Sequence, residues 1–141
     1  MNLSVHFTVS VILSIILYPF YGVSSLFSLV GGFLIDIDHL FLTIYYHGIY
    51  HPRKVYLFCS KQPITKFKNQ IFLFHTIEFF SFLLLGSLFS KYILMALIGF
   101  IVHSLMDWYD EYKAGFGHKE FSIFYTLYKV HKIKITGQSH T

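Results

Sequence analysis

The sequence predicts an all-α membrane protein, a bundle of four transmembrane helices followed by a short interfacial helix near the C-terminus. Of the 141 residues, 55% are hydrophobic and only 13% are charged, which is the composition of a small membrane protein. The apolar residues gather in four stretches, each near the roughly 20 residues that a helix needs to cross a bilayer. Basic residues are concentrated between the second and third stretches and after the fourth.

The four apolar stretches define the expected spans. The first is expected over residues 3–20, because Pro19 lacks the N–H that a continuing helix needs. No basic residue precedes it and no small-residue cleavage site follows it, so we expect it to be kept and not removed as a signal peptide. The other spans are expected over residues 23–45, 70–89 and 92–108, with tyrosines and Trp108 near their ends as interfacial anchors.

Basic residues predict the orientation of these spans. The loop between the second and third spans has no acid and five basic residues: Arg53, Lys54, Lys61, Lys66 and Lys68. Such loops favour the cytoplasmic side, so this loop and both termini are expected on the cytoplasmic side of a prokaryotic inner membrane. The loop can also attract anionic headgroups, which makes membrane lipid the expected partner. A nucleic-acid partner is not favoured, because the basic residues are few.

The chain divides into two predicted parts. Residues 1–112 form the transmembrane domain, and residues 113–141 form a cytoplasmic amphipathic tail. In the tail, residues 120–131 have the apolar stripe of a helix that lies in the membrane interface or packs on the bundle. His47 and His51, beside the basic loop, are expected at the surface. The single cysteine, Cys59, excludes an internal disulfide.

Acidic residues inside the apolar spans are the unusual feature of this chain. Four of its seven acidic residues lie there, and each has a histidine within four positions. Ionisable groups at membrane depth are costly and mark functional sites. The expected spans contain no lysine or arginine, so histidines, hydroxyls or a bound cation must balance the carboxylates.

The acidic residues and their histidines are expected to meet at one site. Residues three or four apart share a helix face. The pairs with this spacing are Asp36 and His39, His75 and Glu78, and His103 and Asp107. On the expected topology these pairs, together with His6, fall at one depth on the cytoplasmic side. Helical bundles build metal sites from carboxylates and imidazoles on facing helices, so the sequence predicts a metal centre here.

The predicted metal ligands are His6, Asp36, Asp38, His39, His75, Glu78, His103 and Asp107. This donor set suits one or two divalent ions, with zinc first and manganese or iron as alternatives. Asp38 points away from Asp36 in a regular helix, so it can serve a second metal, orient a ligand or mark a helix break. Glu78 and Asp38 are also the predicted catalytic residues, since either can take a proton from bound water. For His6 alone, a hydrogen bond between helices is an equal alternative.

The order of these motifs resembles a known family. The chain has His6, then Gly-Gly-Phe-Leu-Ile-Asp-Ile-Asp-His at residues 31–39, His75-Thr76, and His-Ser-Leu-Met-Asp at residues 103–107. Over about residues 3–108 it resembles the YdjM-type, LexA-binding, inner membrane-associated family of metal-dependent hydrolases. Ile35 stands where that family often has proline, and its His-Arg-Gly segment has no clear match here.

The resemblance implies a membrane-embedded metal-dependent hydrolase. That family looks distantly similar to zinc-dependent phospholipase C and its related nucleases, so the implied substrate is a phosphoester or an ester, including a lipid, at the cytoplasmic membrane face. The rival predictions are a non-enzymatic metal or haem binder and a cation carrier. A carrier needs polar residues through to the far side, where the spans are apolar apart from scattered serines and tyrosines, and a haem site does not need so many acids.

Overall fold

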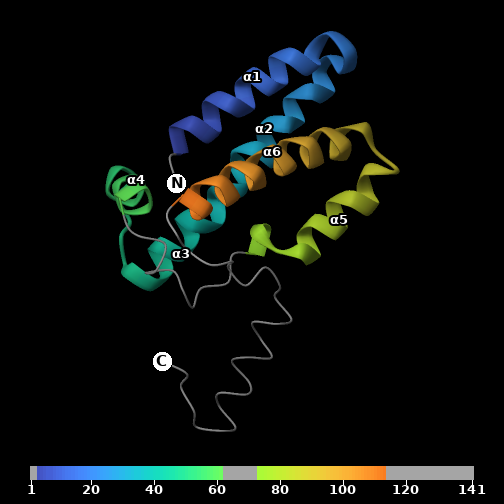
Figure 1. Cartoon of the computed structure of the whole chain (residues 1–141). Helices are drawn as coiled ribbons and strands as arrows, with labels where there is room; N and C mark the ends of the chain where they lie inside the picture. The colour runs from blue at the N-terminus through green and yellow to red at the C-terminus, as the bar shows by residue number, and fades with distance from the viewer. Residues whose placement is uncertain (1–2, 62–72, 114–141) are drawn as a thin grey trace, which may run out of the picture.

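The computed structural model describes residues 3–61 and 73–113, and every element in these two ranges is helical (Figure 1). The predicted all-α class is therefore confirmed. In chain order the elements are α1 (Leu3–Tyr21), η1 (Gly22–Leu26), α2 (Phe27–Gly32), η2 (Leu34–Asp36), α3 (Ile37–His47), α4 (Pro52–Lys61), η4 (Leu73–His75), α5 (Ile77–Ser87) and α6 (Lys91–Lys113). The predicted tail helix over residues 120–131 lies outside the described residues.

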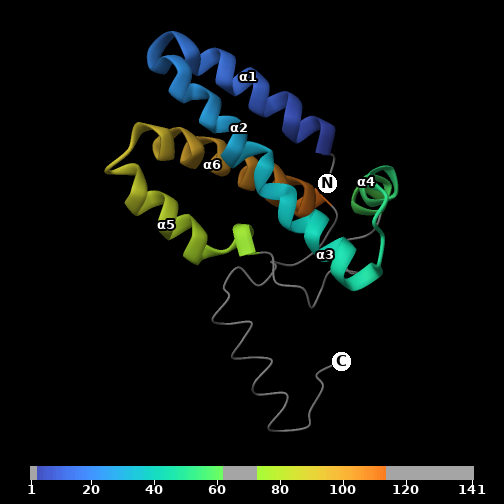
Figure 2. The same ribbon diagram turned by 180° about the vertical axis from the view of Figure 1, so that it is seen from behind.

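The long helices pack side by side and alternate in direction along the chain, so α2 and α6, which pack against each other, run parallel. α1 and α2 form a hairpin closed by η1, α6 packs against α2, and α5 packs against α6 (Figures 1 and 2). The start of α1, the junction of α2 with α3, the start of α5 and the end of α6 consequently lie at one end of the molecule (Figure 1). This arrangement brings sequence positions that are far apart to the same level.

Two segments of the described chain are long and apolar enough to cross a membrane. They are Leu3–Tyr45, which folds back at η1, and Lys91–Asp110 within α6. α5 has 11 residues and extends only about 16 Å at 1.5 Å per residue, which is shorter than the roughly 30 Å hydrocarbon core. Two segments are thus long and apolar enough to cross a membrane, while four spans remain a prediction.

The structure differs from the expected elements at the end of the first span and in the loop after the second. Pro19 lies inside the last turn of α1, and the helix ends at Tyr21 because Gly22 adopts the left-handed conformation, with φ of 56°. The expected loop after the second span contains α4. Its Val55 is only 3% exposed. The segment is therefore a helix with a buried apolar side chain, although its basic residues suggested a loop.

Polar side chains fill much of the interior, and large apolar side chains cover the outside. Buried polar residues include His6, Ser28, Thr43 and His103, whereas most large apolar residues on the outer faces of α1, α5 and α6 are exposed, Ile15 among them at 66%. A water-soluble monomer rarely exposes so many large apolar side chains. The distribution suits a helical bundle whose outer surface contacts an apolar phase.

Serines that look scattered in the sequence line the interface of α1 with η1 and α2. Ser10 donates to the carbonyl of His6 at 2.7 Å, and Ser14 donates to the carbonyl of Ser10 at 3.0 Å. The hydroxyl oxygens of Ser14 and Ser28 lie 2.6 Å apart, and Ser28 donates to the carbonyl of Ser25 at 2.8 Å. Small hydroxyl side chains let helices approach closely while their hydrogen-bonding groups remain satisfied.

Glycines bring α2 and α6 into backbone contact. A Cβ placed on Gly31 would overlap the carbonyl oxygen of Ala96, and a Cβ on Gly99 would overlap that of Ser28. Because these neighbours are backbone atoms, neither can rotate aside. The close contact fixes α6 against the C-terminal end of α2, next to the predicted metal ligands.

The second expected span is broken at Phe33. α2 ends at Gly32, Phe33 has φ −135° and ψ −48°, and η2 is a 3₁₀ turn in which the N–H of Asp36 donates to the carbonyl of Phe33 at 3.2 Å. A continuous α-helix would have used the carbonyl of Gly32 for this bond. The break leaves the Gly32 carbonyl to a side chain and changes the direction in which the following residues point.

The Gly31→Ala and Gly99→Ala variants should be destabilised by roughly 1–3 kcal/mol or more, because the added methyl group overlaps backbone. The matched control is Gly86→Ala, whose Cβ would meet only the Ile93 side chain, at 3.1 Å, and should cost little. Thermal unfolding in detergent, followed by circular dichroism, measures the difference. Equal melting temperatures for all three variants would contradict the close α2–α6 contact.

Candidate metal centre

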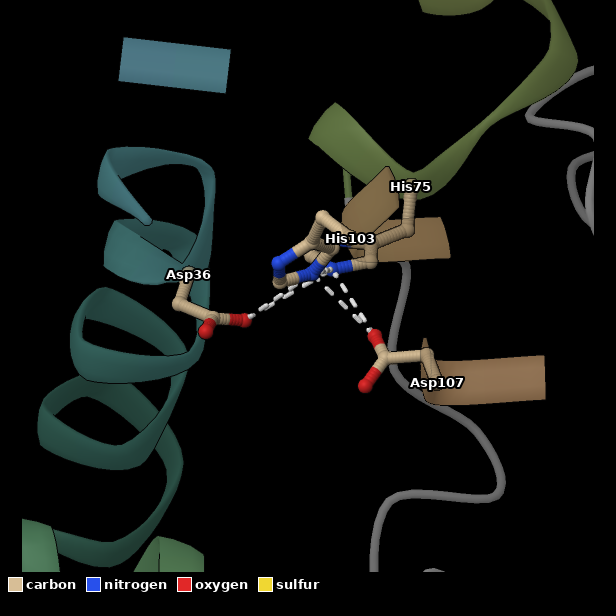
Figure 3. A group of neighbouring side chains, drawn as sticks. All are labelled: Asp36, His75, His103 and Asp107. Atoms are coloured by element: carbon tan, nitrogen blue, oxygen red, sulfur yellow. Dashed lines mark hydrogen bonds and ion pairs between the residues drawn. The ribbon is translucent and has the colours of Figure 1, made fainter. Parts of the chain in front are cut away.

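Two histidines and two aspartates from three parts of the chain converge near one end of the bundle. Asp36 comes from the end of η2, His75 from the end of η4, and His103 and Asp107 from consecutive turns of α6 (Figure 3). One donor atom from each of the four lies within 4.8 Å of each of the others. This group of side chains, called here the four-donor site, can hold a metal ion.

The spacing of the donor atoms matches a small coordination shell. Nε2 of His103 lies 3.1 Å from Nε2 of His75, 3.2 Å from Oδ2 of Asp107 and 3.5 Å from Oδ1 of Asp36. Nε2 of His75 lies 3.6 Å from Oδ2 of Asp107 and 3.7 Å from Oδ1 of Asp36. Ligands about 2.0–2.1 Å from a tetrahedral cation are separated by about 3.3–3.4 Å. The measured distances bracket that value.

The helix break sets the orientation of His103. Its Nδ1 lies 3.0 Å from the carbonyl oxygen of Gly32, and because a carbonyl only accepts, Nδ1 carries the proton. In the neutral ring Nε2 then has a lone pair, directed at the other donors. Metal-binding histidines are commonly fixed in this way by a bond from the other ring nitrogen. The Gly32 carbonyl, which η2 leaves outside the helical ladder, thus prepares His103 to bind a cation.

Asp38 and Thr76 position His75. Oδ2 of Asp38 accepts from Nδ1 of His75 at 3.1 Å and from the N–H of Phe74 at 3.3 Å, so Nε2 of His75 faces the four-donor site. Thr76 accepts from the N–H of Phe79 at 3.3 Å and thereby caps α5. Of the three sequence-based alternatives for Asp38, the helix break is present, and its carboxylate contacts His75.

Buried carboxylate oxygens at the site lack hydrogen-bond partners within the described residues. Within residues 3–61 and 73–113, neither oxygen of Asp36 takes part in a hydrogen bond, although the side chain is only 3% exposed. A proton shared by the Nε2 atoms of His75 and His103 would satisfy those two atoms and leave Asp36 unsatisfied. A cation held here would contact all four side chains at once and would offset the desolvation of the carboxylates. This donor chemistry therefore fits a metal ion.

His6 contacts two members of the four-donor site. Its Nδ1 lies 3.0 Å from Nδ1 of His103, and its Nε2 lies 3.5 Å from Oδ1 of Asp107. A consistent proton assignment has Nε2 of His6 donate to Asp107, while the single N–H at Nδ1 of His103 is shared between the Gly32 carbonyl and Nδ1 of His6. His6 then positions both His103 and Asp107 through these contacts, and Oδ2 of Asp107 remains available to a cation.

Six of the eight predicted ligands belong to two donor groups. Asp38, His39 and His75 form a second group, which shares His75 with the four-donor site. Glu78, half-buried in the first turn of α5, belongs to neither group. Its predicted role as ligand or base remains a prediction, as does that of His6 as a ligand. The role of the Gly32 carbonyl is not predicted by the sequence; the Gly31-Gly32 pair just before the acidic motif is the available signal.

One side of the four-donor site is closed and the other is accessible. The side chains of Asp36 and His103 are 3% and 0% exposed, whereas those of His75 and Asp107 are 18% and 17% exposed. A molecule that approaches the site must therefore pass His75 and Asp107.

Comparison with protein-family models, with curated proteins and with solved structures gives no match to this chain. The site is therefore interpreted from its own residues.

Removal of metal should destabilise the protein. A ligand that binds only the folded state stabilises it by about 4 kcal/mol when the ligand concentration is about a thousand times the dissociation constant. Dialysis against a chelator should therefore lower the melting temperature of the wild-type protein, and added divalent metal should restore it. In the Asp36→Ala/His103→Ala double variant the chelator should have no effect. Identical melting curves of the wild type with and without chelator would contradict a resident cation.

The His6→Ala variant distinguishes a positioning residue from a ligand. If His6 only orients Asp107 and His103, its loss should weaken metal affinity roughly 10–100-fold without changing the number of bound ions, and His6→Gln should recover part of that affinity, because the amide can still donate to Asp107. Isothermal titration calorimetry measures both quantities. A lower stoichiometry would show that His6 is itself a ligand.

Proposed function

We propose that this protein is a membrane-embedded metal-dependent hydrolase that acts on a phosphoester or an ester, including a lipid, at the cytoplasmic face of a prokaryotic inner membrane. The observation that carries the proposal is the convergence of two imidazole Nε2 atoms with the unsatisfied carboxylate of Asp36 and with Asp107. A divalent cation there would acidify a bound water and polarise the oxygen of the bond under attack.

The membrane location is supported by the polar interior and the apolar outer surface of the helices. We place four spans in the bilayer, with α5 and the residues before it as the third. The basic residues then put both termini and the metal centre on the cytoplasmic side. At that depth the centre meets lipid headgroups, where phosphoester and ester bonds are found.

Zinc is the proposed ion, with manganese and iron as alternatives, because mixed imidazole and carboxylate donors suit all three. Asp38 already accepts from His75 and from the backbone of Phe74. Glu78 lies one turn beyond His75, at the start of α5, so we assign it the role of proton acceptor. Substrate would approach past His75 and Asp107, the partly exposed members of the site.

A second candidate function is a non-enzymatic metal binder. It is favoured by one observation: four protein donors at tetrahedral spacing can fill the coordination shell and leave no position for water, as in structural zinc sites. An enzyme would need one carboxylate, Asp107 by its exposure, to give way to substrate or water, or a cation with more than four ligands.

Metal content and turnover together test the proposal. Purified wild-type protein should contain stoichiometric transition metal and should hydrolyse a phospholipid or a generic phosphodiester such as bis(p-nitrophenyl) phosphate. Asp36→Ala and His103→Ala should lose the metal and the activity. Glu78→Gln should keep the metal and lose about 10²–10⁴-fold in rate, the usual share of a general base. The exposed His51 provides the matched control, His51→Ala, which should change neither.

The outcomes separate the two candidates. Metal-loaded protein that is inert toward all substrates would identify the binder. Wild-type protein without metal after chelator-free purification and reconstitution would overturn both candidates.

A further inference from the structure

We propose that the centre holds two cations, the second bound by Asp38 and His39 with Asp36 as the shared ligand, and that its substrate is accordingly an anionic phosphoester. This inference rests on the proposed function, because it adds a second ion to the same site. Its support comes from buried atoms of Asp38 and His39, which are not part of the four-donor site.

Asp38 has one oxygen with a clear role and one without. Oδ2 accepts from His75 and from the N–H of Phe74. Oδ1 is buried and takes part in no hydrogen bond with any residue that the structure describes, and Asp38 as a whole is 6% exposed. Oδ1 of Asp38 lies 3.9 Å from Nε2 of His39, which is itself in a residue only 7% exposed. A buried carboxylate oxygen beside an imidazole nitrogen is half of a cation site.

Asp36 connects this half-site to the four-donor site. Its Oδ1 lies 3.5 Å from Nε2 of His103, on α6, and 3.7 Å from Nε2 of His39, on α3. Oδ1 thus faces both groups, and neither oxygen of Asp36 takes part in a hydrogen bond within the described residues, so the carboxylate is available to a cation on each side. A carboxylate shared in this way is typical of two-metal sites, whose ions lie about 3.5–4 Å apart.

The helix break makes the arrangement possible. In a regular helix Asp36 and Asp38 would point to different faces. Here Asp36 ends the 3₁₀ turn η2, and Asp38 and His39 begin α3. Nε2 of His39 consequently reaches both carboxylates, at 3.7 Å and 3.9 Å. The irregular backbone thus gathers three donors from a stretch of four residues.

The charge of the site also favours two cations. Asp36, Asp38 and Asp107 contribute three negative charges, and the expected spans contain no lysine or arginine. One divalent ion leaves a net charge of −1 beside the donors, which would repel a phosphate group. Two divalent ions leave +1 on the same donors, or zero when the Glu78 carboxylate is counted, so they remove the repulsion of a phosphodiester or phosphomonoester and can hold both the attacking and the leaving oxygen. A neutral carboxylic ester has less to gain from a second ion.

Stoichiometry tests the second cation independently of activity. Purified full-length protein in detergent is loaded with Mn²⁺, desalted and analysed for manganese per chain. We expect two ions in the wild type and in His51→Ala, and one in His39→Ala and in Asp38→Asn. The asparagine retains an oxygen that accepts from His75 but lacks the negative charge. Electron paramagnetic resonance provides a readout that needs no variant, since two Mn²⁺ ions sharing a carboxylate give a spin-coupled spectrum.

Each result has a distinct meaning. One ion per chain in the wild type, with the isolated six-line Mn²⁺ spectrum, overturns the second cation and leaves the proposed function standing. Two ions without spin coupling overturn the role of Asp36 as bridge, and two ions retained in His39→Ala overturn the ligand assignment. No bound manganese, and no zinc or iron when these replace it, overturns the proposed function together with this inference.

Discussion

The structure depends on one electrostatic constraint, the burial of carboxylates in a helical bundle whose expected spans carry no lysine or arginine. Asp36 is almost fully enclosed, and neither of its oxygens has a hydrogen-bond partner in the described part of the chain. Such a group is costly to bury as an isolated anion, and a positive charge beside it would offset that cost. His39, His75 and His103 all direct Nε2 toward its Oδ1, at 3.7, 3.7 and 3.5 Å. Neutral imidazoles do not supply that charge, whereas a cation held by these side chains would.

The backbone is irregular where the site needs it and regular elsewhere. The break at Phe33 removes the Gly32 carbonyl from the helical ladder and supplies it to Nδ1 of His103. An unsatisfied carbonyl inside an apolar bundle would be unfavourable, so the break and the histidine require each other. Glycine contacts between α2 and α6 keep this pair in place. The same close contact between α2 and α6 therefore determines both the helix packing and the orientation of His103.

The site is asymmetric in a way that bears on its chemistry. Asp36 and His103 form a dry inner wall, while His75 and Asp107 are partly exposed. A fully enclosed set of four donors would serve stability alone. Partial exposure on one side would give a reactant access to a bound ion, and Oδ1 of Asp36 and Oδ1 of Asp38 also lie 3.7 Å and 3.9 Å from Nε2 of His39 on α3. Both candidate functions, and the one-ion and two-ion arrangements, therefore rest on the same buried polar side chains.

The sequence by itself determined the helical class, the residues that gather at one level and most of the donor set. Apolar periodicity and the position of each His/Asp pair along its helix suffice for this, because both are local properties. Only the tertiary structure decided that Asp38 contacts His75, that the Gly32 carbonyl orients His103, and that Glu78 lies in neither donor group. These facts depend on a helix break and on contacts between residues up to 71 positions apart. No periodicity within one segment specifies how its neighbours will meet it.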